Sequence, residues 1–387
     1  METVICDISA LRFWRTPPVV RLLASGQVAD TGLQKFVSEE TVVRLQNELI
    51  DTLPCCEPFV SGARWRHAGQ LAQNLRDIFF ALAPCLTLPI DVLVEKRNAK
   101  KTAVVQPRYW SGDLPPGSII PITENVSVAS PAFALQQVVA RSSWIEGLMM
   151  ANELCGTFSV YECPPAIKHL IAVLLEDNAS RKAFYSQSSW APCLSDGAIS
   201  DLWSRPALME SADMLLLAES GTSCRGRQRL IEIAELVKPG AASSLEVQAG
   251  MLLGLSRHRG GEGFGDFEFN KRVPLTSKAQ ALAQKSACVC DLFFEGAQLD
   301  IECQGALVHD NEGSFISDFD RSAALQEMGI NVLFASAGLL SSPRRFDAFS
   351  DLVAKELDIK RPKQTSAHEA AALKLRAALF SDWRKLM

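Results

Sequence analysis

Two apolar segments joined by a short turn, each carrying acidic residues where an apolar residue would normally stand, constrain the fold of this chain most strongly. They occupy residues 286–305, SACVCDLFFEGAQLDIECQG. We predict a β-hairpin with a two-residue turn at Gly296-Ala297, because glycine at the first position suits a type II′ turn. In that register Asp291 faces Glu302 across the ladder, and the period of two places Gln304 on the same face as Glu302.

Two carboxylates that face each other across a sheet destabilise it unless a cation lies between them. The simplest alternative, a solvated polar face, fits poorly with the apolar VCDLFF around Asp291. We therefore predict that Asp291 and Glu302 bind Mg²⁺ or Mn²⁺, with the backbone carbonyl of Cys303 between the polar side chains. Such an ion polarises a phosphoryl oxygen, activates a bound water and stabilises the leaving oxygen, which phosphodiester hydrolysis requires.

Size and composition place the chain among soluble globular proteins. Its 387 residues exceed the roughly 250–300 that one core usually holds, so we expect two or more domains. The content of 48% hydrophobic and 21% charged residues is ordinary for a folded protein. A net charge of −5 excludes a generally basic nucleic-acid binder but allows local basic patches.

The cysteine pattern and the apolar runs indicate a cytoplasmic protein. Eleven cysteines include no Cys-x-x-Cys pair, so we expect reduced thiols and no structural zinc site. The opening METVICDISALRFWR lacks the pattern of a signal peptide, and no apolar run approaches the ~18 residues of a membrane span. We expect no association with a membrane.

The region 1–238 reads as mixed α/β, with a sub-boundary near residue 85. Helices are predicted over 38–53 and 69–82, and strands dominate from residue 86 to about residue 131. Ser130 before Pro131 is a good N-cap, and helices follow up to Pro239-Gly240, which we take as the domain boundary.

The region 239–360 reads as one α/β module. Ser243 and Glu246 form a capping box that opens its first helix. The predicted order is helix, three strands, helix, strand and helix. The last segment, 361–387, reads as an appended amphipathic helix rich in alanine and leucine.

The order of polar residues in this module resembles the PD-(D/E)xK nuclease superfamily, and in particular its very-short-patch repair endonucleases. The likeness covers about residues 240–358 and rests on the following positions: Glu246, Asp291, Glu302, Gln304, Asp318, Arg321, Leu325, Gly329 and Val332. It implies a restriction-endonuclease-like mixed sheet flanked by helices. It also implies that Asp291 and Glu302 bind magnesium and that Glu246 supports them. Gln304 stands where the family usually has the lysine that orients the attacking water.

Several other residues are candidates for contact with DNA. Arg321 is a candidate phosphate clamp, and His309 could act as a general acid or bind phosphate. Lys271 and Arg272 could follow a DNA backbone, as could the basic run at 257–259. An ordinary surface role explains each of them equally simply, and the capping box alone also explains Glu246.

The N-terminal region resembles AbiEi-type antitoxins and regulators of bacterial phage-defence loci. The likeness rests on LTLPIDVLV, RYWSGDLPPGS, ITENVSVASPAFALQQVV and NELCGTF. In that family the corresponding region follows a winged-helix DNA-binding domain, but residues 1–60 show no helix-turn-helix pattern.

Three functions fit these patterns. The first is a metal-dependent DNA endonuclease in bacterial defence or a toxin–antitoxin system, with DNA and a protein partner of that system as its ligands. The second is a catalytically inactive DNA-binding regulator or antitoxin that uses the nuclease-like fold as a scaffold. Metal binding by Asp291 and Glu302 would separate these two. The third is an interaction protein whose C-terminal helix contacts a defence complex.

Overall fold

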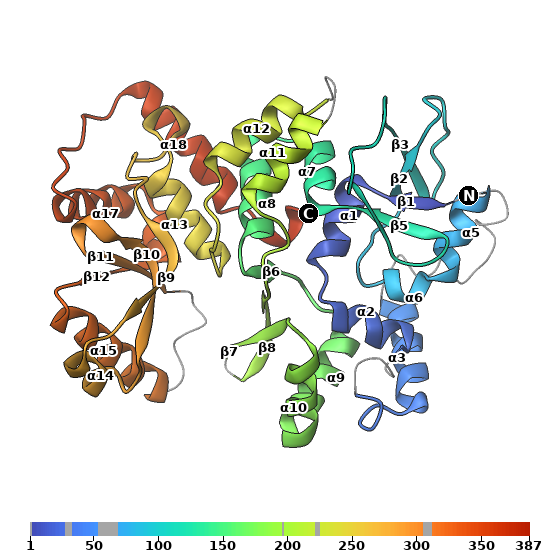
Figure 1. The fold of residues 1–387 in the computed structure, drawn as a ribbon, viewed down its shortest axis with the longest axis horizontal. Helices are drawn as coiled ribbons and strands as arrows, with labels where there is room; N and C mark the ends of the chain where they lie inside the picture. The colour runs from blue at the N-terminus through green and yellow to red at the C-terminus, as the bar shows by residue number, and fades with distance from the viewer. Residues whose placement is uncertain (1, 28–32, 53–68, 196, 221–224, 305–311) are drawn as a thin grey trace.

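A computed structural model describes residues 2–27, 33–52, 69–195, 197–220, 225–304 and 312–387. Within these ranges the chain forms three sheets flanked by helices, which confirms the predicted mixed α/β class (Figure 1). None of the helices in these ranges is long and apolar enough to cross a membrane.

The first sheet lies in the N-terminal region and has the order β3-β2-β1-β5-β4. Its strands are β1 (Thr3–Ile5), β2 (Ile90–Val94), β3 (Val105–Tyr109), β4 (Ile119–Pro121) and β5 (Val126–Ala129). Strands β2 to β5 fall where strands were predicted. The alternation and branched residues of 86–131 suit a pleated, half-buried surface. The sheet packs against α1 (Asp7–Arg15), which packs in turn against α7 (Pro131–Val139), and Ser130 caps α7 as predicted.

Helices fill most of the remaining N-terminal region. They are α2 (Pro18–Ser25), α3 (Glu39–Thr52), α5 (Gly69–Asp77), α6 (Phe79–Leu82), α8 (Trp144–Cys155), α9 (Pro165–Glu176), α10 (Asn178–Gln187), α11 (Ser211–Ser220) and α12 (Arg227–Leu236). A small antiparallel sheet not predicted from the sequence lies among them, with β6 (Phe158–Val160), β7 (Ala191–Ser195) and β8 (Ala198–Ser204).

The C-terminal module is built on a mixed four-stranded sheet of order β12-β11-β10-β9. Its strands are β9 (Glu268–Pro274), β10 (Ala287–Phe294), β11 (Leu299–Gln304) and β12 (Asn331–Ser336), with β11 and β12 parallel and the other pairs antiparallel. Its helices are α13 (Ser244–Gly254), α14 (Ser277–Ala283), α15 (Glu312–Glu327), α16 (Ala337–Ser341) and α17 (Pro343–Glu356). The predicted order of elements is found, with α14 and α16 in addition.

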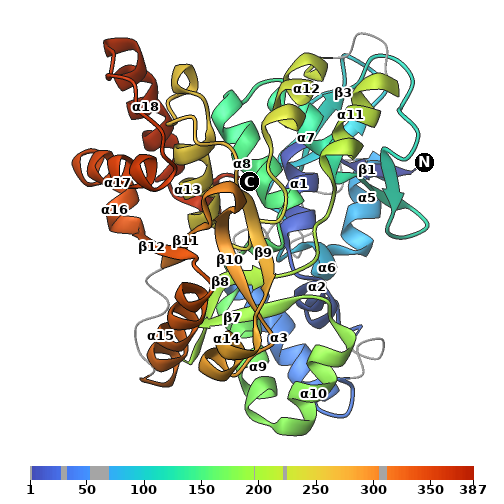
Figure 2. The same cartoon turned by 60° about the vertical axis from the view of Figure 1, so that its left-hand side comes forward.

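Helices cover both faces of this sheet. Helices α14 and α15 lie on one side, and α13 and α17 lie on the other (Figure 2). The side chains between the sheet and α14 and α15 form a separate small core, whereas the opposite face joins the main core of the chain. Asp291 of β10, with Glu302 and Gln304 of β11, lines a cavity together with residues of α15 and β12.

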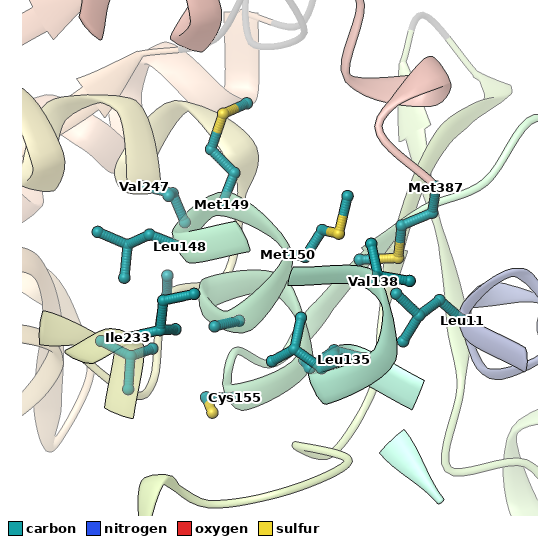
Figure 3. Close-up of a cluster of buried hydrophobic side chains, with 14 of the residues drawn as sticks. Leu11, Leu135, Val138, Leu148, Met149, Met150, Cys155, Ile233, Val247 and Met387 are labelled. Atoms are coloured by element: carbon teal, nitrogen blue, oxygen red, sulfur yellow. The ribbon is translucent and has the colours of Figure 1, made fainter. Parts of the chain in front are cut away.

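The C-terminal helix α18 (Ser366–Leu379) packs within the chain. It contacts α13 of the module and α8 of the N-terminal region. The final residue, Met387, is buried beside Leu11 and Val138 (Figure 3). One continuous core thus extends from Ile5 to Met387 and joins the module to the N-terminal region.

A buried polar network fixes this junction. The carboxylate of Glu153 on α8 accepts hydrogen bonds from Arg15 Nε at 2.8 Å and from Trp383 Nε1 at 2.6 Å. Arg205 Nη2 donates to the backbone carbonyl of Glu153 at 2.6 Å. The arginines on either side hold the pKa of Glu153 below its ordinary value, although burial opposes them. The ion pair is fully desolvated, so the loss of one partner would leave an uncompensated charge.

Candidate functional site

The hairpin has the predicted register. Leu292 pairs with Ile301 and Phe294 with Leu299, and the same count places Asp291 opposite Glu302. The predicted two-residue type II′ turn is wrong. The strands are joined by a 3₁₀ turn over Glu295–Ala297 followed by Gln298 at φ 48°, which makes a four-residue loop. A helical turn that ends in one left-handed residue closes a four-residue loop without changing the register.

The alternation of side chains in β10 slips at Asp291. Cys290 packs in the core under α14 and α15, but Leu292, two residues on, packs in the main core on the opposite face. Asn270 of β9, opposite Asp291 by the strand count, adopts the left-handed conformation at φ 50°. The carboxylate of Asp291 accepts a hydrogen bond from the backbone N–H of Cys303 at 2.8 Å, so the side chain of Asp291 is hydrogen-bonded to the backbone of β11 at this point.

Asn270 also connects this distortion to Glu246. Its side-chain amide donates to Glu246 Oε2 at 2.6 Å. Ser243 caps α13 as predicted. The predicted capping box is incomplete, because Glu246 accepts the backbone N–H of Ala242 at 2.7 Å and the hydroxyl of Ser243 at 2.9 Å, and not the backbone N–H of Ser243. Burial, and after it the charge of Asp291, raises the pKa of Glu246 to about 7. Glu246 therefore serves as a cap and also lies within electrostatic reach of Asp291.

Four of the predicted site residues line one cavity of about 200 Å³. They are Asp291, Glu302, Gln304 and Arg321. The cavity is completed by Cys303, Ser322, Leu325, Val332 and Phe334. Arg321 of α15 donates both to the carboxylate of Glu302 and to the backbone carbonyl of Val289.

Asp300 is a site residue that sequence reasoning missed. It is completely buried, and neither carboxylate oxygen receives an N–H or hydroxyl from the described residues. Its polar neighbours are the carboxyl group of Glu302 and the thiol of Cys290. Burial raises the pKa of Asp300, and burial together with Asp300 raises the pKa of Glu302 to about 9. Burial therefore favours the protonated form of this carboxyl pair, whereas Arg321 favours the ionised form of Glu302.

This donor set fits a magnesium or manganese ion. Such ions prefer oxygen ligands, keep several waters and need only one or two protein carboxylates, here Asp291 and Glu302. Burial first, and the neighbouring Asp300 after it, raise the pKa of Glu302, and the ion pair with Arg321 opposes that rise. The described ranges contain no group of three or more His, Cys, Asp or Glu side chains placed to hold a metal.

Lys271 and Arg272 do not line this cavity. Lys271 pairs with Glu268 at 2.7 Å, and Arg272 is exposed on β9. His309, and the side chain of Asp318, fall outside what the structure describes. In the basic run at 257–259, Arg257 pairs with Glu262 and Arg259 with Glu232, so both arginines are bound within the chain.

Comparison of the chain with protein-family models, with curated proteins and with solved structures finds no match. The two family resemblances remain predictions, and the geometry of the hairpin is the ground for a functional proposal.

Proposed function

We propose that the C-terminal module is a magnesium-dependent DNA endonuclease that hydrolyses phosphodiester bonds. One observation carries the proposal: Asp291, Glu302, Gln304 and Arg321, from three different elements, line a single cavity beside Glu246. A bacterial defence or toxin–antitoxin role, as the N-terminal resemblance implies, is part of the same proposal.

Asp291 and Glu302 would hold the ion, which when bound lowers the pKa of a water and neutralises charge on the phosphate. The N–H of Cys303 fixes the Asp291 carboxylate, so that ligand is oriented in advance. Gln304 would orient the attacking water through its amide, since glutamine cannot act as a base. Arg321 would pair with a phosphate oxygen through its planar fork.

Glu246 would support Asp291 through charge. Its pKa of about 7 lets it lose a proton near neutral pH, which adds negative potential beside Asp291. Asn270, Ala242 and Ser243 hold the Glu246 carboxylate in place. We therefore expect activity to rise with pH through the neutral range, because more carboxylates are ionised.

A second candidate function is a DNA-binding regulator with an inactive nuclease fold. The specific observation in its favour is the ion pair of Arg321 with Glu302, which supplies a positive charge where a metal would lie. Gln304 in place of the usual lysine points the same way. In this case the acidic residues would be neutralised within the chain.

The test is conversion of supercoiled plasmid to nicked and linear forms with Mg²⁺ or Mn²⁺. Three proteins are compared: the parent, Asp291→Ala, and Glu295→Ala as a matched control on the exposed hairpin turn. The endonuclease proposal expects cleavage by the parent and the control and none by Asp291→Ala. No cleavage by any of the three, with plasmid bound by all, contradicts the proposal and favours the regulator.

A further inference from the structure

A larger cavity lies in the N-terminal region, on elements that take no part in the hairpin site. It has a volume of about 610 Å³ and is bordered by α2, α6 and the residues between β4 and β5. Helices α2 and α6 are neighbours in the fold (Figure 1). A volume of this size is typical of pockets for small organic ligands.

The walls of this cavity are mainly apolar and partly aromatic. Phe13, Leu22, Phe79, Phe80 and Ile122 contribute to them. Such a surface favours a flat hydrophobic body, which aromatic rings bind by stacking and by exclusion of water.

One cation, Arg21, is built into the wall. Its guanidinium lies over the Phe13 ring at 3.9 Å from the ring centre, and Nη1 donates to the Phe13 carbonyl at 3.2 Å. Among the residues that the structure describes, no carboxylate pairs with Arg21. The Arg21 side chain is half-buried, and this burial lowers its pKa. Arg76, also on the cavity wall, is exposed and adds positive potential.

We propose that this cavity binds a small molecule with a flat apolar body and one anionic group, which pairs with Arg21. A carboxylate or phosphate matches the guanidinium fork, and the stacked Phe13 ring keeps that fork oriented. A neutral ligand would cover the half-buried guanidinium without supplying a counter-ion, so the site discriminates for acids. This site is independent of the nuclease proposal.

The test uses 8-anilinonaphthalene-1-sulfonate as an anionic aromatic probe and N-phenyl-1-naphthylamine as its neutral counterpart. We expect saturable binding of the anionic probe at one site, measured by fluorescence. Arg21→Met keeps the apolar stem and removes the charge. It should weaken binding of the anionic probe at least about tenfold and change binding of the neutral probe by less than about twofold.

Two further variants keep the result interpretable. Ala81→Phe fills the cavity from α6 with Arg21 intact, so it should weaken binding of both probes. Arg97→Met removes an exposed arginine outside the cavity and should leave binding of both probes unchanged. Near-UV circular dichroism checks that each variant is folded. Competition by 2-naphthoate and 2-naphthyl phosphate then separates a carboxylate ligand from a phosphate. Absence of saturable binding by the parent, or equal binding by the parent and folded Arg21→Met or Ala81→Phe, would overturn the proposal.

Discussion

The carboxyl pair of Asp300 and Glu302 should make the metal-free module less stable as pH rises. Both folded pKa values lie above their ordinary values, and that of Glu302 is about 9. The stabilisation from the retained proton is therefore complete below about pH 4 and is lost as pH rises through about 9. One extra proton in the folded state lowers the free energy of unfolding by about 1.4 kcal/mol per pH unit. Glu246 contributes similarly only up to its pKa of about 7.

Asp300→Asn isolates this effect. The amide has the same shape and can donate to Glu302, so the variant needs no shared proton. Between pH 7 and 8.5, in EDTA, the parent should lose about 2 kcal/mol of stability that the variant keeps. Other groups contribute equally to both proteins. Hydrogen exchange of the β10 and β11 amides, compared between the two proteins at each pH, measures the difference. Glu302→Gln should behave in the same way, and equal pH slopes in the parent and both variants would refute the shared proton.

Three further perturbations test other parts of the account. Glu153→Ala leaves Arg15 buried without its partner and should cost about 3–5 kcal/mol in urea unfolding, whereas a cost below about 1 kcal/mol would contradict the buried network. Asn270→Ala loses the bond to Glu246 in a left-handed conformation and should lower stability by about 1–3 kcal/mol, with Asn270→Gly recovering the backbone part. Glu246→Gln should flatten the rise of Mg²⁺-dependent cleavage between pH 6 and 8, and an unchanged profile would exclude its ionisation as the cause.

The fold of the C-terminal module could be predicted in outline because its signals are local. The N-cap Ser243 places α13, and a turn centred on Gly296-Ala297 sets the hairpin register. This register places Asp291 opposite Glu302. The observed four-residue loop keeps the register of the predicted two-residue turn, because both are centred on Gly296-Ala297.

The remaining site residues depend on contacts that a linear pattern does not contain. The period of two already places Asp300 on the same face as Glu302, but its complete burial there depends on the packing of that face against α14 and α15. The sequence pattern also does not predict the left-handed conformation of Asn270 in the middle of β9, although asparagine tolerates that conformation better than most residues.

Long-range pairing of strands explains why the observed N-terminal region differs from the predicted one. β1 has three residues, too few for an alternation signal, and it exists because β2 and β5 pair with it across more than 80 residues. The helix α18 showed its amphipathic pattern, but its partners α8 and α13 could be identified only in the folded chain.

Binding of Mn²⁺ at the hairpin tests the central claim most directly. Electron paramagnetic resonance at pH 8 counts the ions that the protein removes from solution, with the parent, Asp291→Asn and the surface control Glu295→Gln compared at equal concentration. We predict one ion per chain for the parent and the control, and loss of that ion in Asp291→Asn. Equal binding by all three proteins, or none by the parent, would contradict a cation site formed by Asp291 and Glu302.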